Sequence, residues 1–335
     1  MTGARELENP SLPEAAAAVA RRIESCRAPL IVSHIRLDGD AVGSEMGLAH
    51  ILAAMGKTPV AANDSEIPRA LRFLPGLDRV CRPWTPGRLE GDLVVTLDTP
   101  SLSRLGRVGD CLPQGVDVVR IDHHRADEPA VCLTWEDTRQ SSVGEMIWQM
   151  AAGRGWPLPA EAATALFVAI ITDTGRFTFP NTRPSALTAA AALLDAGADH
   201  QAACRALYQS ESLGLMRLKG EGVLGLRFVF GGKVAVMRLS LDMFRRHQVN
   251  PIDTQEFADI PRSVEGVHVG VLLREMDEAG KVKVSLRSHD GLDLRPVARE
   301  FGGGGHPAAA GCETTGGLDR AEAAVLASLA RNLGL

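Results

Sequence analysis

The sequence predicts an α/β fold, with an N-terminal doubly wound, mostly parallel sheet and a smaller C-terminal α+β domain across a cleft. The chain has 335 residues, and single cores rarely grow past about 250–300 residues. Short apolar runs alternate with helical patterns in the first part, which is typical of parallel sheets. Hairpin-like runs with glycine turns follow. We therefore predict domains over 1–205 and 223–335, joined by a connecting segment over 206–222.

The first domain begins with an Ala-rich amphipathic helix in "MTGARELENPSLPEAAAAVARRIE". Apolar runs too short for helices then predict strands at "PLIVSH", "DLVVTLD" and "VDVVRIDHH". The helical pattern "AVGSEMGLAHILAAMG" separates the first two of these runs. Because the runs are nearly continuous in Val, Ile and Leu, we expect strands that are buried on both faces.

Further helices complete this domain. The pattern of "QSSVGEMIWQMAAGRG" is helical. The apolar core of "AEAATALFVAIITDTGRFTF" fits a helix or a strand, and its Ala-rich first half favours a helix that ends near Asp173. "PSALTAAAALLDAG" is a helix with a glycine stop. The following segment is helical in pattern but poor in apolar residues, so we expect it to connect the domains.

The second domain reads as hairpins followed by a helix. "RFVFGGKVAVMRLS" and "VHVGVLLREMDEAGKVKVSLRS" each contain two strand-like runs and a glycine turn. A glycine-rich segment, "FGGGGHPAAAG", precedes the final helix, "LDRAEAAVLASLARNLG". These elements predict a smaller α+β domain.

The composition excludes several classes of protein. The net charge is −5, which gives no basic surface for gripping long nucleic acid, so a nucleic acid substrate is expected to be short. No stretch approaches the roughly 18–20 apolar residues of a membrane span. The six cysteines are scattered without a C-x-x-C pair, as in reduced cytosolic proteins. We therefore expect a cytoplasmic protein that does not bind membranes.

Acidic residues and histidines follow four apolar runs. They are His34, Asp38 and Asp40 after the first run, Asp98 after the second, Asp122, His123 and His124 after the third, and Asp173 after the fourth. A single aspartate after a strand often caps a helix or a turn. The carboxyl ends of strands in an open parallel sheet, however, line one crevice. We therefore predict that these side chains converge.

The converging residues favour a divalent metal site. Carboxylates and neutral imidazoles together suit manganese, and less specifically magnesium, cobalt or zinc. Four carboxylates and two histidines are enough ligands for two ions. Two ions about 3.5–4 Å apart share a water, lower its pKa and stabilise in-line attack on phosphorus. The set therefore predicts phosphoester hydrolysis.

These motifs resemble a known family. "SHIRLDGDAVGS", "VTLDTP", "IDHH" and "IITDTGRF" are similar, in order, to the four motifs of the DHH phosphoesterases. "VSLRS" and "FGGGGHPAAAG" resemble the substrate-binding domain associated with them. The resemblance covers nearly the whole chain and is greatest to the short oligoribonuclease and pAp phosphatase enzymes of the NrnA type.

The resemblance implies two manganese ions, with magnesium or cobalt as substitutes. The implied ligands of the first ion are His34, Asp38 and Asp98. The implied ligands of the second ion are Asp40, Asp98, His123 and Asp173. Asp98 would bridge the ions, Asp122 would orient a metal ligand, and His124 would face the scissile phosphate. The implied catalytic residues are therefore Asp98, Asp122 and His124.

The chain departs from the family pattern at two places. Leu37 stands where the family usually has proline, and "RADEP", Arg125 to Pro129, stands where it often has asparagine. The sequence therefore does not predict how this loop contacts a leaving nucleotide. The positive charge of Arg125 is a candidate replacement for the asparagine contact.

The second domain is expected to hold the substrate. A run of glycines lets backbone N–H groups approach a phosphate closely, although a mobile loop is the alternative. The run follows a helical pattern, so it is not a dinucleotide-binding fingerprint. Arginine suits bidentate phosphate contact. The expected substrate-binding residues are Arg287, Ser288, Gly304, Gly305 and His306.

The leading hypothesis is a manganese-dependent hydrolase of short RNA oligomers. It would release mononucleotides and remove the 3′ phosphate of pAp, 3′-phosphoadenosine 5′-phosphate. One alternative is a phosphodiesterase for pApA, pGpG or cyclic dinucleotides such as c-di-AMP. Others are a pyrophosphatase or exopolyphosphatase, and a nucleotide-binding regulator without metal chemistry. Substrate preference, direction of digestion and oligomeric state, including a homodimer, are left open.

Overall fold

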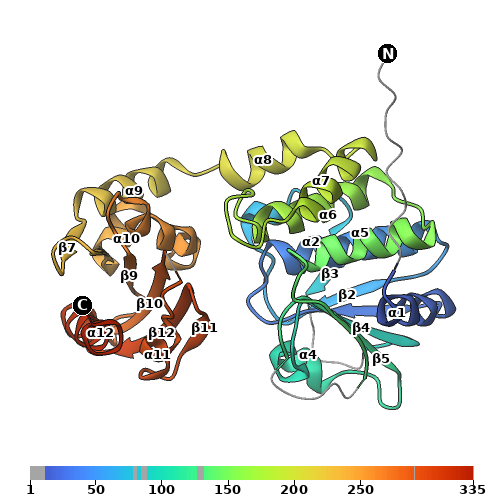
Figure 1. Cartoon of the computed structure of the whole chain (residues 1–335), viewed down its shortest axis with the longest axis horizontal. Helices are drawn as coiled ribbons and strands as arrows, with labels where there is room; N and C mark the ends of the chain where they lie inside the picture. The colour runs from blue at the N-terminus through green and yellow to red at the C-terminus, as the bar shows by residue number, and fades with distance from the viewer. Residues whose placement is uncertain (1–11, 78–80, 84–88, 127–131, 290, 335) are drawn as a thin grey trace. The chain divides into compact units, whose positions relative to one another are not determined.

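The computed structural model describes residues 12–77, 81–83, 89–126, 132–289 and 291–334. The chain divides into two compact units, Met1–Ser210 and Glu211–Leu335 (Figure 1). Helix α9 (Leu213–Leu224) covers much of the segment that we expected to connect the domains. Its Leu218 is fully buried in a core cluster of the second unit, so this helix belongs to that unit.

The first unit is built on a parallel sheet of six strands. Their bounds are β1 (Pro29–Val32), β2 (Val60–Asn63), β3 (Cys81–Pro83), β4 (Leu93–Leu97), β5 (Val118–Asp122) and β6 (Leu133–Glu136). The strand order is β3-β2-β1-β4-β5-β6, and every neighbouring pair is parallel. The predicted doubly wound sheet is confirmed. Its order reverses between β1 and β4, which is where such sheets form a ligand crevice.

Helices cover both faces of this sheet. They are α1 (Glu14–Ser25), α2 (Gly39–Ala54), α4 (Arg107–Asp110), α5 (Val143–Arg154), α6 (Ala160–Asp173), α7 (Pro184–Asp195) and α8 (His200–Tyr208), with 3₁₀ turns η1 (Arg69–Leu71) and η2 (Leu102–Leu105). The helices α1, α2, α5 and α6 contribute to the core cluster that contains Ile31 and Val95. The turn η2 and helix α4 pack on Leu30 and Val94, which point to the opposite face (Figure 1). Both faces are buried, which explains the continuous apolar runs.

Glycines on one side of α2 let it approach α6 closely. Gly39, Gly43 and Gly47 recur every four residues and so share one face of the helix. A Cβ atom on Gly43 would lie 2.5 Å from the carbonyl oxygen of Ala165 in α6. This close contact brings the first turn of α2 beside the last turn of α6.

The second unit contains a mixed sheet in the order β11-β12-β10-β9-β8-β7. Its strands are β7 (Arg227–Val229), β8 (Val234–Leu239), β9 (Val269–Glu275), β10 (Lys281–Ser288), β11 (Gly304–His306) and β12 (Ala309–Thr315). Its other helical elements are α10 (Leu241–His247), η3 (Pro251–Asp259), η4 (Pro261–Ser263), α11 (Arg295–Arg299) and α12 (Gly317–Leu333). Only β8 and β9 pair in parallel among these neighbours. The predicted α+β character is confirmed.

The glycine-rich segment forms a strand at the edge of this sheet. Gly304, Gly305 and His306 make up β11, which pairs antiparallel with β12. Gly305 has φ +138°, a conformation that favours glycine, and its missing Cβ leaves room for the backbone of β12. The segment is therefore a paired strand and not the mobile loop considered as an alternative.

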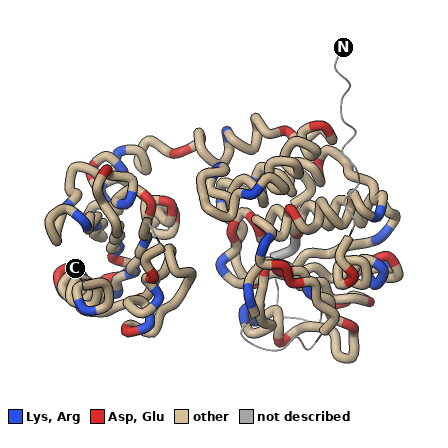
Figure 2. Tube along the Cα trace, viewed as in Figure 1, with Lys and Arg blue, Asp and Glu red and all other residues tan. Residues whose placement is uncertain are grey.

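The distribution of charged residues and the hydropathy of the helices agree with what the composition predicted. Figure 2 shows basic and acidic residues interspersed along the described parts of both units. Within the same ranges, no helix has both the length and the apolar character needed to cross a membrane.

Candidate metal centre

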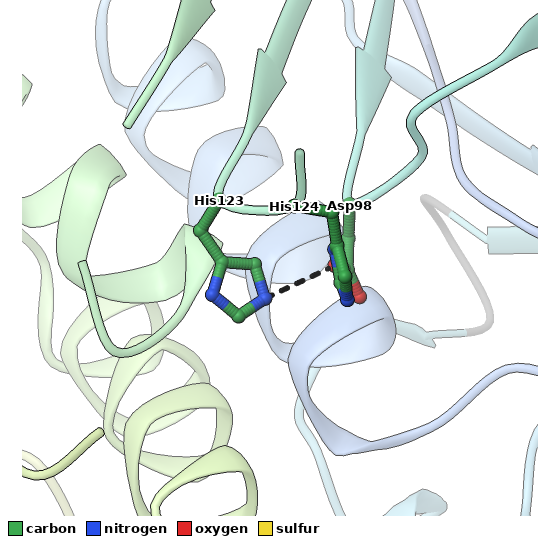
Figure 3. Close-up of side chains that lie close together, drawn as sticks. All are labelled: Asp98, His123 and His124. Atoms are coloured by element: carbon green, nitrogen blue, oxygen red, sulfur yellow. Dashed lines mark ion pairs between the residues drawn. The ribbon is translucent and has the colours of Figure 1, made fainter. Parts of the chain in front are cut away.

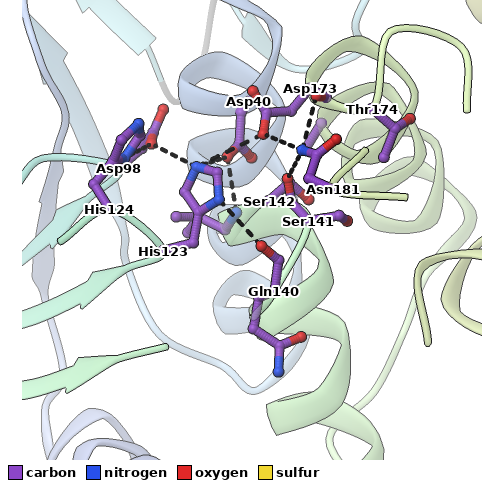
Figure 4. Close-up of polar contacts among 12 residues, drawn as sticks. Asp40, Asp98, His123, His124, Gln140, Ser141, Ser142, Asp173, Thr174 and Asn181 are labelled. Atoms are coloured by element: carbon purple, nitrogen blue, oxygen red, sulfur yellow. Dashed lines mark hydrogen bonds and ion pairs between the residues drawn. The ribbon is translucent and has the colours of Figure 1, made fainter. Parts of the chain in front are cut away.

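The predicted ligands meet where β1, β4 and β5 end. Figure 4 shows four of them, Asp40, Asp98, His123 and Asp173. His34 follows β1, and Asp98 follows β4 directly. Asp122 is the last residue of β5, and the two histidines come next. On the helical side, Asp38 caps α2 and Asp40 lies in its first turn.

Asp173 reaches the site from a helix. It is the last residue of α6, as the Ala-rich pattern predicted. Three strand ends and the termini of two helices therefore supply the expected ligands. The close packing of α2 on α6 explains how the helix end reaches the sheet edge.

Asp98 lies at the centre of the cluster. Its Oδ2 is 3.3 Å from His34 Nε2, and its Oδ1 is 3.2 Å from His124 Nδ1 and 3.5 Å from His123 Nε2 (Figure 3). The residue is 2% exposed and has a left-handed backbone, with φ 53°. One buried carboxylate thus faces three histidines, which suits a group shared by two cations.

The candidate ligand atoms at Asp98 and around it form three groups. Within each group, the candidate ligand atoms all lie within 4.8 Å of one another. The first group contains His34, Asp38 and Asp98, and the second contains Asp40, His123 and Asp173. A third, overlapping group contains Asp98, His123 and His124. The structure therefore brings together the residues that we expected to bind each ion.

Two donor atoms at the centre lack a hydrogen-bond partner among the described residues. They are Asp98 Oδ1 and His123 Nε2, both buried. A buried polar atom without a partner costs about 1–3 kcal/mol, so such atoms call for an explanation. A mixed set of carboxylate oxygens and imidazole nitrogens fits divalent cations of the manganese type. The residues present therefore fit the metal that the motifs imply.

The carboxylates make this site strongly attractive to positive charge. Burial opposes protonation of His34, but its hydrogen bond with Asp98 and the charge of Asp38 raise its pKa to about 9. The pKa of His123 is also raised to about 9, against the effect of burial, by Asp98, Asp173 and Asp40. Metal ligation requires neutral histidines, so cations would displace these protons and bind more weakly at low pH.

Asp40 is held by the N-terminus of α5, a contact that sequence reasoning missed. Its Oδ2 accepts a hydrogen bond from the Val143 N–H at 2.8 Å, and its Oδ1 accepts one from the Gly144 N–H at 3.1 Å. The Ser44 hydroxyl donates to the same Oδ1 at 2.9 Å. The first amides of a helix favour a negative charge. They therefore favour the carboxylate form of Asp40, while burial and the charge of Asp98 raise its pKa well above the ordinary value. More than a hundred residues separate these hydrogen-bond partners in sequence.

Asn181 holds Asp173, and no pattern in the sequence indicated this contact. Its Nδ2 donates to the Asp173 carbonyl at 3.1 Å and lies 3.4 Å from Asp173 Oδ2. The same amide donates to the carbonyl of Ser141 at 3.0 Å. Asn181 thereby ties the end of α6 to the segment that leads into α5.

The two adjacent histidines have different neighbours. Asp122 Oδ1 accepts a hydrogen bond from the His124 backbone N–H at 2.9 Å and lies 3.0 Å from His124 Nδ1. His123 Nδ1 lies 3.3 Å from the carbonyl oxygen of Gln140 (Figure 4). Asp122 therefore orients His124, whereas a main-chain carbonyl positions His123, the candidate metal ligand.

The two departures from the family pattern have different outcomes. Leu37 is 6% exposed and packs in the core of the first unit, so its side chain fixes the loop by packing. Arg125 is exposed. The rest of the "RADEP" loop is described only as far as Ala126, and its residues 127–129 lie outside the described ranges.

In the second unit, strand pairing brings Arg287 and His306 near each other. Both residues pair with Ala309 of β12, one from each side, so the two side chains belong to the same face of the sheet. Gly304 and Gly305 precede His306 on β11. The Ser288 hydroxyl is buried and donates to the Leu292 carbonyl at 2.8 Å. The structure therefore does not bring this hydroxyl together with the other four expected residues.

Asp259 and Arg262 lie beside Arg287, and sequence reasoning missed both. Arg262 Nη2 donates to Asp259 Oδ1 at 2.8 Å, and Arg287 Nε is 3.6 Å from the same oxygen. Burial lowers the pKa of Arg287, while Asp259 raises it and Arg262 lowers it. Two guanidinium groups thus share one carboxylate, which leaves a net positive charge at the end of β10.

Comparison with known proteins agrees with this geometry. Residues 29–170 match the model of the DHH family, N-terminal domain, and residues 231–331 match that of the DHHA1 domain. The bifunctional oligoribonuclease and PAP phosphatase NrnA of Thermus thermophilus is 34% identical over 317 residues, which are 94% of this chain and 93% of that protein. The protein of the same name from Bacillus subtilis is 31% identical, over 83% of this chain and 86% of its own.

A solved structure extends the likeness to the whole fold. An exopolyphosphatase-related protein from Bacteroides fragilis superposes with a TM-score of 0.86 at 25% identity, over 96% of this chain and 98% of that chain. The family models, the relatives and the cluster of aspartates and histidines lead to one conclusion. The chain belongs to the DHH family of phosphoester hydrolases.

Proposed function

We propose that the protein is a manganese-dependent phosphoesterase that degrades short RNA oligomers to mononucleotides and converts pAp to AMP. The observation that carries this proposal is the cluster around Asp98, at the switch point of the sheet. Relatives that match nearly their full length bear the names of these two activities. We place the enzyme in the cytoplasm, in line with its scattered cysteines.

In this proposal, the residues of the first unit hold two cations and the phosphate. His34 and Asp38 would bind one ion, and Asp40, His123 and Asp173 the other, with Asp98 shared. Bound divalent cations supply a water of lowered pKa and neutralise charge on the phosphate.

His124 has a separate role in the proposal. Its Nδ1 faces Asp98 and Asp122, so we assign its Nε2 to a phosphate oxygen. Burial opposes protonation, but the hydrogen bond with Asp122 and the nearby carboxylate of Asp98 raise the pKa of His124 to about 11. A protonated ring is a strong donor to an anionic oxygen. Asp122 would keep the ring charged and correctly turned.

The second unit would bind the 5′-terminal phosphate of the substrate. Arg287 offers a planar fork of donors, and His306 lies on the same sheet face. Gly304 and Gly305 expose backbone at the sheet edge. We keep Ser288 in this region in a structural role, because its hydroxyl donates a hydrogen bond to the Leu292 carbonyl just after β10.

The test is a substrate panel with purified protein. We expect manganese to support mononucleotide release from 5′-labelled RNAs of two to five residues and phosphate release from pAp. EDTA should abolish both activities, and added manganese, magnesium or cobalt should be compared for recovery. Asp98→Asn should lower turnover at least about 100-fold, because the shared carboxylate is lost, whereas Asp195→Asn, at an exposed position, should not.

Other outcomes would redirect the assignment. Turnover of pyrophosphate or polyphosphate alone would contradict the nucleotide substrate and favour the pyrophosphatase or exopolyphosphatase alternative. Exclusive turnover of pApA, pGpG or c-di-AMP would favour a dinucleotide phosphodiesterase. Sedimentation of the same sample would determine whether the enzyme is a homodimer.

A further inference from the structure

An open pocket of about 660 Å³ has one wall at Ile35, the residue after the predicted ligand His34, and the proposed mechanism does not use it. Its walls come from segments that follow β1, β2 and β4, so it shares the sheet edge of the predicted ligands. Ile35 lines the pocket and follows His34, whose Nδ1 lies 2.8 Å from the Ile35 carbonyl oxygen. Leu102 lines it from η2, four residues after Asp98.

The pocket combines apolar surface with polar groups. Ile35 and Leu102 are 37% and 38% exposed, so both present apolar atoms to a ligand. The Ser103 hydroxyl and the ion pair between Arg107 and Asp64 add polar edges, with Arg107 Nε donating to Asp64 Oδ1 at 2.7 Å. Small-molecule sites commonly have this mixture of apolar walls and a few polar groups.

Gly106 allows the residues that line this pocket to pack closely together. It has φ 63°, and a Cβ atom there would lie 2.5 Å from both Asp64 Oδ2 and Ile35 Cγ2. The Arg107 backbone N–H donates to the same Asp64 oxygen at 2.8 Å. The absence of a side chain therefore lets the ion pair and Ile35 meet at one wall.

We propose that this pocket binds the nucleobase of the second nucleotide of an oligoribonucleotide. A base has flat apolar faces and a polar rim. Ile35 and Leu102 match the apolar faces, and Ser103 and the ion pair between Arg107 and Asp64 match the polar rim. The inference rests on the proposed function and adds a subsite to it. Because Ile35 in its wall follows the predicted ligand His34 directly, we assign the pocket to the nucleotide that follows the scissile phosphate.

The two proposed substrates differ in what they offer this pocket. In both, water adds to phosphorus and the bond from phosphorus to the 3′ oxygen breaks, so that the 3′ oxygen leaves with a proton. In pApA the released phosphate carries the second nucleoside on its 5′ oxygen, and the products are two molecules of AMP. In pAp the released group is inorganic phosphate, which carries no base. The pocket therefore contributes to hydrolysis of the oligonucleotide and not to that of pAp.

The experiment compares Leu102→Asn with Leu194→Asn in the full-length enzyme. Leu194 lies on α7, outside the pocket lining, and is 41% exposed, close to the value for Leu102. For Leu102→Asn we expect the KM for pApA to rise about fivefold, from lost apolar contact, with an unchanged KM for pAp. Leu194→Asn should leave both values unchanged.

A substrate analogue tests the same subsite without relying on a variant. A dinucleotide whose second residue lacks its base should show a raised KM with the wild-type enzyme, similar to that of Leu102→Asn with pApA. Leu102→Asn should not raise it further. An unchanged KM for the abasic substrate, or an equal rise for pAp and pApA in Leu102→Asn, would overturn the inference. Failure of the wild-type enzyme to hydrolyse either nucleotide would instead contradict the proposed function, and the inference with it.

Discussion

At the scale of single residues, the carboxylates of Asp98 and Asp122 position three histidines. Asp98 faces His34, His123 and His124 with its two oxygens. Asp122 contacts His124 through both the backbone N–H and the ring. The "DHH" triplet therefore contains three different groups. Asp122 is an orienting carboxylate, His123 is a candidate metal ligand, and His124 is a candidate hydrogen-bond donor to a phosphate oxygen.

Asp122→Asn tests whether this carboxylate acts through His124. We expect kcat to fall about 10- to 100-fold, as is typical when a residue that orients a functional group is replaced. His124→Asn should lower kcat at least as much, and the double variant should lose no more than His124→Asn alone. Steady-state kinetics with pAp measure all three. Losses that multiply in the double variant would mean that Asp122 acts independently of His124.

Burial of Glu45 near the site should make the stability of the folded protein depend on pH. Its side chain is completely buried in α2, where Asn63 Nδ2 donates to it at 2.7 Å. Burial is the main cause that raises its pKa from 4.5 to about 7. Between these values the folded state binds one proton more than the unfolded state, so the stability contributed by this group is lost as pH rises toward 7.

Glu45→Gln should remove this dependence. In metal-free protein, we expect the stability of the variant relative to wild type to increase by about 3 kcal/mol at most between pH 4 and pH 8. Urea unfolding at both pH values measures the difference. A relative stability that is the same at pH 4 and pH 8 would contradict the raised pKa.

At the scale of elements, the contact between α2 and α6 controls the geometry of the site. Gly43 allows contact with the backbone of α6, and Gly39 allows contact with the Thr172 side chain near its end. Asp40 comes from the first turn of α2, and Asp173 from the last residue of α6. The glycine spacing was visible in "GDAVGSEMG", but its meaning depended on knowing which helix lies opposite.

Gly43→Ala should disturb this contact. The added Cβ would meet the carbonyl oxygen of Ala165 and the amide of Ala169, and neither backbone atom can move without the helix. We expect a loss of about 1–3 kcal/mol in stability and weaker manganese binding, because Asp40 and Asp173 move apart. Thermal unfolding and metal titration measure these effects.

A matched control for this variant is Gly220→Ala in α9. Among the residues that the structure describes, no atom outside its own helix lies within 4 Å of the Cβ that this change would add, so stability should be unchanged or slightly higher. Equal stability and equal metal affinity of Gly43→Ala and wild type would contradict the proposed control of the site by helix packing.

At the scale of the whole molecule, two units with separate cores support one family assignment. The parallel sheet carries the candidate metal ligands, and the mixed sheet carries Arg287 and His306. The sequence predicted this division from the change between continuous apolar runs and hairpin patterns. It did not identify β2, β3 and β6, because their segments "VAAN", "CRP" and "LTWE" lack the continuous run of Val, Ile and Leu that predicted β1, β4 and β5.

The sequence by itself determined the fold class, the end of α6 at Asp173 and the set of acidic residues and histidines that converge. Hydrophobic periodicity and helix propensity are local properties, and parallel strands bring their carboxyl ends to one edge wherever they lie in the chain. Only the tertiary structure decided that Asp40 meets the N-terminus of α5, that Asn181 holds Asp173, and that a pocket opens beside Leu102. Each of these depends on how helices and loops distant in sequence pack against one another, and no local pattern specifies such a contact.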